Sequence, residues 1–598
     1  MLIFYNTYKT KMSNIFFSIK EKFQQIIDQF IIAQAKSGLV IQPTDFVLEP
    51  TKQSTNGDLA CNIALVYSKQ FGLSPQILAQ QISSQLQHPY INKIEIAPAG
   101  FVNIFLHPKA YYDNLFDLLT QPFTYPNLGK NLLVNLEYAS PNPTGPMHIG
   151  HTRGAIYGDV LAKLLQKVGY KVLKEYYIND AGKQINTLLE SVYVRYLQAC
   201  KQNTQLADNH YPGEYLIEIG QKIYQQFGDS LLNLNSSQYF PKIRSLVLQE
   251  MLNIIKADLL ALKIVHDNYF SEQEELHNTN KIAQVVADLT QQGYIYQGVL
   301  QAPKTNKGVG SVSLEDFCQE EQTLFRSTIF GDDQDRVIKK SDGSFTYFAS
   351  DLAYLQSKFS RGAKFFIMPL GYDHLGYVKR LTAATSIITK QQAKIKIILC
   401  QMVKFIKNGE SLKMSKRAGN FITAKQVVDE IGCDALRFLM LTRKNDAPFD
   451  FDLNKAIEQS KDNPIFYVQY AHTRCCSVLK NITKEMPELN LTNYQQLDLS
   501  LLQTETELAL LKKIINFERI IESAVVNFEP HKIAFYLQEL SAEFHAWWHL
   551  GVVNAEYKFI IKNNLPLTFA RVSLLIAIQK IIAEGLDIFN IAPLTEMH

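Results

Sequence analysis

The chain has 598 residues, of which 46% are hydrophobic and 20% charged, and its formal net charge is +3. This length exceeds what one core supports, so two to four domains are expected, while the near balance of charge neither requires nor excludes a nucleic-acid partner. The seven cysteines form no Cys-x-x-Cys pair, which favours free thiols and disfavours a disulfide framework or a zinc knuckle.

Residues 1–12 have neither the sustained apolar core and cleavage site of a signal peptide nor the Arg-rich, Ser-rich bias of a transit peptide. We interpret them either as a lead without fixed structure or as a stretch upstream of an alternative start at Met12. No apolar run of membrane-spanning length is identified in the sequence. A cytoplasmic protein without a membrane partner is therefore expected.

Residues 13–110 are predicted to form a small α+β domain. Apolar residues at helical spacing predict three helices, over 14–35, 56–71 and 74–87. Two further runs, 93–96 and 101–106, predict a pair of strands around the turn Pro98-Ala99-Gly100.

The most informative stretch is Glu137–His151, which reads E-Y-A-S-P-N-P-T-G-P-M-H-I-G-H. An apolar run at 131–135 predicts a strand before it, and apolar residues at helical spacing predict a helix over 152–167 after it. A strand, a turn rich in proline and glycine, and a helix are the opening of a nucleotide-binding βα unit.

Two glycines and two histidines give this turn its chemistry. Gly145 and Gly150 allow the backbone to approach a ligand closely, beside a helix N-terminus that favours phosphate. His148 and His151 flank that point, and an imidazole there can donate hydrogen bonds to phosphate oxygens during a reaction. The alternatives are a turn with satisfied histidines or a metal pair; zinc is disfavoured because no cysteine pair or third histidine lies nearby at ligand spacing.

The alternation of strands and helices continues downstream. A strand over 171–177 leads into the polar turn Ile178–Gly182, at the position where open parallel sheets bind ligands. Residues 187–325 are mostly helical and carry no chemical motif. A strand, a helix and a strand then follow, over 365–370, 376–389 and 395–403. The order predicts an α/β fold with a doubly wound parallel sheet.

A second candidate for phosphate binding is the loop Lys413-Met414-Ser415-Lys416-Arg417. Two lysines separated by a methionine and a serine are suited to clamp a polyphosphate, although a lone basic run is usually a solvated loop. From about Leu439 onward, long amphipathic patterns predict a helical bundle, over 508–527, 531–548 and 569–588.

The His-x-Gly-His turn and the Lys-Met-Ser-Lys loop, in this order, resemble the paired signatures of class I aminoacyl-tRNA synthetases. Four phrases are similar to arginyl enzymes in particular: G-D-L-A-C-N-I-A (57–64), A-P-A-G-F-V-N-I (97–104), Y-P-G-E-Y (211–215) and the junction 459–474. The resemblance covers nearly the whole chain.

This resemblance implies a class I Rossmann-type catalytic domain in two halves, 125–186 and 326–440. It also implies an N-terminal domain, 13–110, that contacts the tRNA elbow. A mostly helical insertion, 187–325, would contact the acceptor end, and an all-α domain, 441–598, would bind the anticodon.

The resemblance further implies a reaction and a set of residues. Arginine would be activated with ATP, accompanied by Mg²⁺, to arginyl-adenylate and pyrophosphate, and then transferred to the 3′ ribose of its tRNA by a monomeric enzyme. The implied catalytic residues are His148, His151, Lys413 and Lys416. Those implied to bind ATP are Pro141, Asn142, Pro143, Thr144, Gly145, Pro146, Met147, Ile149, Gly150, Gly371, Asp373, His374, Met414 and Ser415. Those implied to bind arginine are Glu137, Asn142, Tyr347, Asp351 and Asp373, and those implied to bind tRNA are Tyr467, Tyr470, His472 and Arg474. No dedicated protein site for a metal is implied.

The chemistry of arginine agrees with these residue types. A guanidinium is a planar fork of five donors with a permanent charge, so its pocket needs carboxylates and amide or phenol acceptors. Tyr347 and Asp351 stand four residues apart and would share one face of a helix. Each residue also has a structural interpretation: Glu137 as a solvated strand-end charge, Tyr347 as core, and Asp351 as a helix N-terminal charge.

Three alternative functions stay open. The first is a class I synthetase for cysteine, glutamate or lysine, and the second is a synthetase-like tRNA-binding protein without catalysis. The third is a nucleotidyltransferase, because His-x-Gly-His also occurs in that class. Two features depart from the arginyl pattern: the lysine loop is intact, whereas it is degenerate in many arginyl enzymes, and His598 follows a terminal phrase that commonly ends on methionine.

Overall fold

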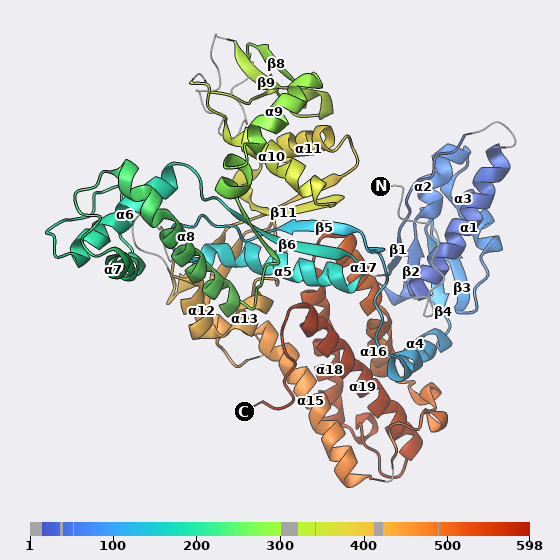
Figure 1. Ribbon diagram of the computed structural model, residues 1–598. Coiled ribbons are helices and arrows are strands. Elements are labelled where there is room, and N and C mark those ends of the chain that lie inside the picture. Colours follow the sequence, from blue (N-terminus) through green and yellow to red (C-terminus); the bar gives the residue numbers. More distant parts are fainter. Residues whose placement is uncertain are drawn as a thin grey trace.

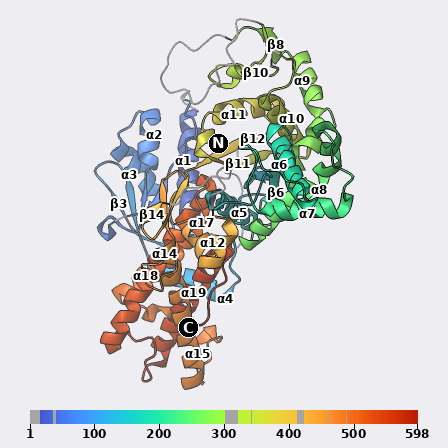
Figure 2. The same ribbon diagram turned by 90° about the vertical axis from the view of Figure 1, so that its left-hand side faces the viewer.

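The computed structural model describes residues 15–35, 40–51, 53–300, 321–340, 342–411, 422–460, 462–487 and 489–597 (Figure 1). An α/β unit lies at the centre of the molecule. A helical arm and a lobe with a small sheet extend from two sides of it, the N-terminal domain lies on a third side, and a bundle of long helices extends below (Figures 1 and 2).

The N-terminal domain is a four-stranded antiparallel sheet with helices packed on it. The strands, in the order β1-β2-β4-β3, are Leu48–Pro50, Leu59–Cys61, Val102–Leu106 and Ile91–Ile96. The helices are α1 (Ile15–Ala35), α2 (Ile63–Phe71) and α3 (Pro75–Gln85). The pairing of the two predicted strands, now β3 and β4, is confirmed.

The helix predicted over 56–71 is wrong in its first part, because that part pairs as β2 with β1 and β4. Gly57 has a φ of +84°, and a Cβ there would lie 2.7 Å from the carbonyl oxygen of Ile104. The Asp58 carboxylate then accepts a hydrogen bond from the amide of Leu106 at 2.8 Å. Contacts with a strand distant in sequence therefore override the local helical pattern.

The central sheet has five parallel strands in the order β12-β11-β5-β6-β7. They are Lys394–Cys400, Phe365–Gly371, Leu133–Glu137, Lys171–Ile178 and Asn268–Ser271. Helix α5 (Thr152–Lys167) covers one face, and α10 (Tyr347–Ser360) and α11 (Tyr377–Ile388) cover the other (Figure 1). The predicted doubly wound sheet is confirmed, and strand order reverses at β5, which places a ligand crevice at the carboxyl end of β5.

Two boundaries in this unit differ from prediction. Strand β5 begins at Leu133 rather than 131 because Lys130 and Asn131 have left-handed backbone angles, with φ of 45° and 60°. The strand predicted over 395–403 is two strands in different sheets: β12 ends at Cys400, and β13 (Val403–Lys407) pairs with β14 (Glu410–Ser411) and β15 (Phe449–Asp452).

The segment predicted as a mostly helical insertion, 187–325, divides into three parts. Helices α6 (Lys183–Ala199), α7 (Tyr215–Phe227) and α8 (Ser236–Ala261) form an arm with its own apolar core. Strand β7 then returns to the central sheet beside β6. Finally α9 (Lys281–Gln291) precedes a small antiparallel sheet, β10-β9-β8, made of Arg336–Val337, Gln322–Phe325 and Ile295–Gly298. The segment is therefore not a single helical unit.

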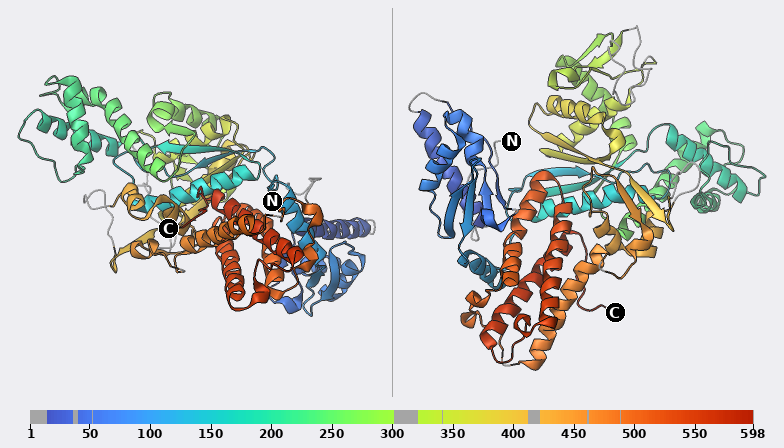
Figure 3. Two further views of the ribbon diagram at one scale, coloured as in Figure 1. Left: turned by 90° about the horizontal axis from the view of Figure 1, so that it is seen from below. Right: turned by 180° about the vertical axis from the view of Figure 1, so that it is seen from behind.

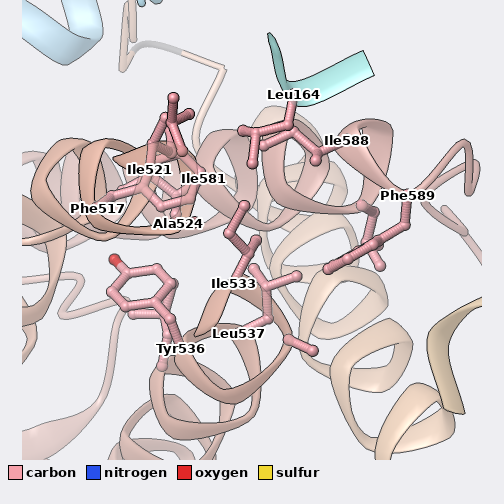
Figure 4. Close-up of a cluster of buried hydrophobic side chains, with 14 of the residues drawn as sticks. Leu164, Phe517, Ile521, Ala524, Ile533, Tyr536, Leu537, Ile581, Ile588 and Phe589 are labelled. Atoms are coloured by element: carbon pink, nitrogen blue, oxygen red, sulfur yellow. The ribbon is translucent and has the colours of Figure 1, made fainter. Parts of the chain in front are cut away.

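The chain then passes through α12 (Ala424–Ile431), α13 (Cys433–Leu439) and α14 (Leu453–Ala456) into the bundle. The bundle contains α15 (Pro464–Glu485), α16 (Glu505–Ile515), α17 (Phe517–Asn527), α18 (His531–Val553) and α19 (Leu565–Ile588) (Figure 3). The helix predicted over 508–527 is interrupted at Asn516. Leu164 of α5 joins the bundle core, so the bundle is packed directly on the central α/β unit (Figure 4).

Helix α19 is the one helix among the described residues that is long and apolar enough to cross a membrane by length and composition. The expectation that no run reaches this length is therefore wrong. In its most apolar window 67% of the residues are buried inside the protein, as the core helix of a bundle requires. Helix α4 (Lys109–Thr120), which the sequence did not indicate, links the N-terminal domain to α16 and α19.

Candidate active site

The turn after β5 is shaped by close contacts at its two glycines. A Cβ at Gly150 would lie 2.9 Å from the ring of His148, and a Cβ at Gly145 would lie 2.5 Å from the hydroxyl of Tyr215. Tyr215, on the helical arm, donates that hydroxyl to the carbonyl oxygen of Thr144 at 2.7 Å. The rings of His148 and His151 stack with centroids 3.7 Å apart and an angle of 19° between their planes. Both histidines therefore lie together at the N-terminus of α5, as predicted.

The same turn is joined to the segment that follows the lysine loop. The amide of Ile149 donates to the carbonyl oxygen of Ile422 at 3.1 Å, and the amide of Ala424 donates to the carbonyl oxygen of Met147 at 2.8 Å. Lys413, Met414, Ser415 and Lys416 lie outside the described residues. Their described neighbour Ile422 is hydrogen-bonded to the histidine turn, so the chain returns from the loop directly at the candidate phosphate site.

Two buried side chains hold this junction. The Asp258 carboxylate accepts the amide of Met147 at 2.7 Å. The guanidinium of Arg153, in the first turn of α5, donates to the carbonyl oxygens of Gln401 at 3.1 Å, Ala447 at 2.9 Å and Lys444 at 2.7 Å. These carbonyls lie beside β13 and β15, so Arg153 ties the histidine helix to the sheet that carries the lysine loop. Neither residue was singled out from the sequence.

Helix α10 brings two predicted arginine-binding residues to the crevice. Tyr347 is 71% exposed at its start, and Asp351 is partly buried one turn later. A Cβ at Gly182 would lie 4.0 Å from the Tyr347 hydroxyl, so this ring extends over the turn that follows β6. The shared helix face predicted from their spacing is thus present in the structure.

Asp351 lies among other carboxylates. Burial, together with the negative charges of Glu137 and Glu272, raises the pKa of Asp351 to about 7, and Arg380 acts weakly in the opposite direction. Glu137 is the last residue of β5 and is buried, with its Oε2 2.8 Å from Nζ of Lys358. The alternative of a solvated edge charge for Glu137 is therefore wrong.

Glu272 is a site residue that sequence reasoning missed. It directly follows β7, is 5% exposed, and starts the π-helix Gln273–His277. Asp180, in the polar turn after β6, fixes this point by accepting hydrogen bonds from the Ser271 hydroxyl at 2.6 Å and the Gln273 amide at 2.9 Å. Because Glu272 reaches the site only through the pairing of β7 with β6, no local pattern could have marked it.

Four further predicted residues lie nearer the surface. Asn142 donates through Nδ2 to Oε1 of Gln184 at 2.8 Å. Gly371 ends β11, and Asp373 and His374 lie in the turn that follows it. The Asp373 side chain is 78% exposed, with Oδ2 3.7 Å from Nε2 of His374. Asp373 thus lies in solvent, whereas Glu137 is buried and Asp351 is partly buried.

The predicted tRNA-contacting residues lie on α15 and separate into two groups. Arg474 donates to the Tyr470 hydroxyl at 2.9 Å, and its guanidinium lies 4.1 Å from the centroid of that ring and 4.6 Å from that of Trp548. Tyr467 is half-buried against His545. His472 is 4% exposed and donates through Nδ1 to the carbonyl oxygen of Leu594 at 2.7 Å. His472 therefore holds the C-terminal segment and is not at the surface, which corrects its predicted role.

Known proteins match the chain along almost its full length. Residues 18–106 match the family model described as Arginyl tRNA synthetase N terminal domain, and residues 114–475 match tRNA synthetases class I (R), catalytic domain. Residues 468–597 match the DALR anticodon binding domain.

Individual relatives agree with these matches. The arginine–tRNA ligase of Rickettsia bellii is 46% identical over 554 residues, which cover 92% of this chain and 95% of that protein. The arginine–tRNA ligase of Rickettsia rickettsii is 44% identical over 582 residues, covering 96% and 100%. The solved structure of Thermus thermophilus arginyl-tRNA synthetase has the same fold, with a TM-score of 0.71 at 19% identity, and the match covers 98% of this chain and 100% of that one.

Proposed function

The chain belongs to the arginyl-tRNA synthetase family, and we propose that its substrates meet at the carboxyl ends of β5, β6, β7 and β11. The protein is a class I aminoacyl-tRNA synthetase that ligates arginine to tRNA with the use of ATP. The observation that carries the proposed site is the burial of Asp351 close to Glu137 and Glu272, because burial and these two charges together raise the pKa of Asp351 to about 7. A positively charged amino acid relieves this concentration of negative charge.

In the proposed site the guanidinium of arginine pairs with Asp351 and Glu272 and contacts the Tyr347 hydroxyl. Carboxylates and a phenol oxygen are the acceptors that five N–H donors require. Glu137 takes the α-amino group, and Asn142 takes the α-carboxylate. Asp373 is left out of the amino-acid pocket because its side chain is in solvent, and it is assigned to the nucleotide side.

In the reaction, the arginine carboxylate attacks the α-phosphorus of ATP and pyrophosphate leaves. The terminal ribose hydroxyl of tRNA then attacks the acyl carbon, and AMP leaves. His148 and His151 donate to the phosphate oxygens, assisted by the N-terminus of α5. Lys413 and Lys416 hold the β- and γ-phosphates from the loop whose downstream end is bonded to the histidine turn. Catalysis thus comes from positioning and charge stabilisation.

The segment from Pro141 to Gly150, with Gly371, His374, Met414 and Ser415, is proposed to surround the nucleotide. Among the residues that the structure describes, no group of three or more His, Cys, Asp or Glu side chains is placed to hold a metal ion. We propose that Mg²⁺ is carried mainly by phosphate and water oxygens, where it would neutralise phosphate charge.

For the tRNA we propose contacts at three places: the N-terminal domain at the elbow, the α6–α8 arm at the acceptor end, and α15 at the anticodon. Tyr470 and Arg474 supply an aromatic ring and a cation at the surface, which suit stacking and phosphate contact, with Tyr467 behind them. A cytoplasmic monomer is proposed, because one chain carries all three surfaces.

The experiment is charging of total tRNA with each of the twenty amino acids, by purified protein with ATP and Mg²⁺. Arginine alone is expected to be charged. His151→Ala and Lys416→Ala are expected to lower charging by about 100-fold or more, in proportion to lost phosphate stabilisation. His549→Ala, which alters an exposed histidine on α18, is the matched control and should leave charging unchanged. If His151→Ala and Lys416→Ala charge like the control, the proposed phosphate site is wrong.

A further inference from the structure

Lys358 is a buried cation directly beneath the proposed amino-acid pocket. Its side chain is 0% exposed. Its Nζ donates to Asn135 Oδ1 at 2.6 Å, Glu137 Oε2 at 2.8 Å and Glu175 Oε1 at 3.2 Å. A lysine is almost never fully buried unless it is paired, so these three acceptors account for its position.

Glu175 already has a cation of its own. Arg361 donates to both of its carboxylate oxygens, and the Tyr354 hydroxyl and Asn268 Nδ2 donate to it at 2.8 and 2.7 Å. Burial by itself would raise the pKa of Glu175, but the charges of Lys358 and Arg361 and their hydrogen bonds hold it well below its usual range. Lys358 is therefore shared between Glu175, which also has Arg361, and Glu137, to which it makes the shorter contact.

Sequence spacing links this lysine to the pocket. Tyr347, Asp351, Tyr354 and Lys358 stand at intervals of four, three and four residues on α10, so they share one face of that helix. The first turns of the face carry the residues proposed for the guanidinium. The last turn carries the cation that contacts Glu137, the residue proposed for the α-amino group.

We propose that Lys358 is a positioning residue for arginine recognition: it fixes the Glu137 carboxylate at the place where the α-amino group of arginine binds. The inference rests on the proposed role of Glu137. Lys358 binds one oxygen of Glu137, Oε2, and the charge of Asp351 repels the same carboxylate. Without the lysine, this repulsion favours displacement of the Glu137 side chain from that place. The contact with the α-amino group would then weaken, while the guanidinium contacts of Asp351 would persist.

The test compares two ligands that differ only at the α-amino group: arginine and 5-guanidinopentanoate, in which hydrogen replaces that group. The KM for arginine is measured in tRNA charging, and the inhibition constant of 5-guanidinopentanoate is measured as a competitor. The variants are Lys358→Met, Glu137→Gln and the double Glu137→Gln/Lys358→Met. The control is Lys364→Met, which alters an exposed lysine just beyond α10.

The expected result is that Lys358→Met raises the arginine KM by about tenfold or more and leaves the inhibition constant of 5-guanidinopentanoate within about twofold, as one lost charged hydrogen bond predicts. Glu137→Gln should likewise raise the arginine KM and leave the inhibition constant of 5-guanidinopentanoate nearly unchanged. The arginine KM of the double variant should be no higher than that of Glu137→Gln. Lys364→Met should change neither constant. A purely structural role would weaken both ligands alike or lower only the folded fraction.

Three outcomes decide the inference. The inference is overturned if Lys358→Met weakens the binding of both ligands equally. It is also overturned if Lys358→Met leaves the ratio of the arginine KM to the inhibition constant of 5-guanidinopentanoate unchanged while Glu137→Gln changes that ratio. In either case Lys358 does not act through Glu137. If Glu137→Gln itself leaves the ratio unchanged, the proposed role of Glu137 fails, and the inference fails with it. If Lys358→Met does not fold, the double variant decides, since it retains the balanced pair of Glu175 and Arg361. The inference is then contradicted if the double variant discriminates between arginine and 5-guanidinopentanoate less well than Glu137→Gln alone does.

Discussion

In the helical bundle, Arg571 of α19 donates to Glu507 Oε1 at 2.6 Å and to the carbonyl oxygens of Glu556 and Lys558, and both charged side chains are buried. In the catalytic unit, Asp351 faces two further carboxylates, Glu137 and Glu272, and its pKa is raised to about 7. One region balances its buried charges within the protein, and the other holds an excess of negative charge.

This difference separates the charges that maintain the fold from those that await a ligand. A buried pair with satisfied hydrogen bonds costs most when one partner is removed, because the other is left as an unpaired buried charge. Carboxylates held close together lower the stability of the free protein, and the proposed cationic ligand would neutralise them. Mutations in the two regions should therefore have opposite effects on stability and on activity.

The largest expected effect is on stability in the bundle. Arg571→Met should lower the free energy of unfolding by about 3 to 5 kcal/mol, because it leaves Glu507 buried without its cation. The kcat for charging, per folded molecule, should stay unchanged. Denaturant unfolding combined with charging assays measures both quantities. Lys562→Met, which removes an exposed lysine 3.8 Å from Glu485 in the same bundle, is the control and should cost less than about 1 kcal/mol. A small change in the free energy of unfolding of Arg571→Met would show that the buried pair of Arg571 and Glu507 does not maintain the bundle.

The next effect is on activity in the catalytic unit. Asp351→Asn should lower kcat/KM for arginine by about 100-fold to 1,000-fold, because the guanidinium loses its carboxylate. The free protein should become more stable by about 1 to 2 kcal/mol, since repulsion from Glu137 and Glu272 is removed. Steady-state charging tests the expected loss of kcat/KM, and thermal unfolding without ligand tests the expected gain in stability. Asp208→Asn, at an exposed position beside the helical arm, should change neither. A loss of both activity and stability in Asp351→Asn would mean that Asp351 is structural.

The parts of the site that the sequence predicted are those made by consecutive residues. The strand, the histidine turn and α5 follow each other directly, so the pattern from Glu137 to Lys167 contains most of their geometry. Tyr347 and Asp351 were found for the same reason, because helical spacing alone places them together. The spacing of Lys358 from Asp351 was equally visible, but a lysine at that position is usually exposed, and only its burial against Glu137 and Glu175 gives it a role.

The parts that could not be predicted depend on pairing between distant segments. Glu272 enters the site because β7 adds to β6, and the intervening arm hides that connection in the sequence. Residues 59–61 read as helix but pair with β1 and β4. His472 is a polar residue of a type that often contacts ligands at a surface. The C-terminal segment covers it, however, and the carbonyl oxygen of Leu594 accepts its hydrogen bond. In each case a tertiary contact decides what local pattern left open.

The smallest expected effect is a pH dependence that tests the charge excess directly. With a pKa of about 7, Asp351 in the free enzyme is ionised above pH 7 and increasingly protonated below it. The KM for arginine should therefore be flat above pH 7 and rise by up to tenfold per pH unit below it, about 1.4 kcal/mol per unit.

Because this pKa is raised above its unfolded value, near 4, the native protein binds the extra proton between about pH 4 and 7. Its contribution therefore makes the free protein less stable as pH rises through that window. Asp351→Asn should remove the pH dependence of both the arginine KM and the stability of the free protein. If these dependences persist in that variant, another group is the one that titrates, and the negative charge of the pocket is balanced elsewhere.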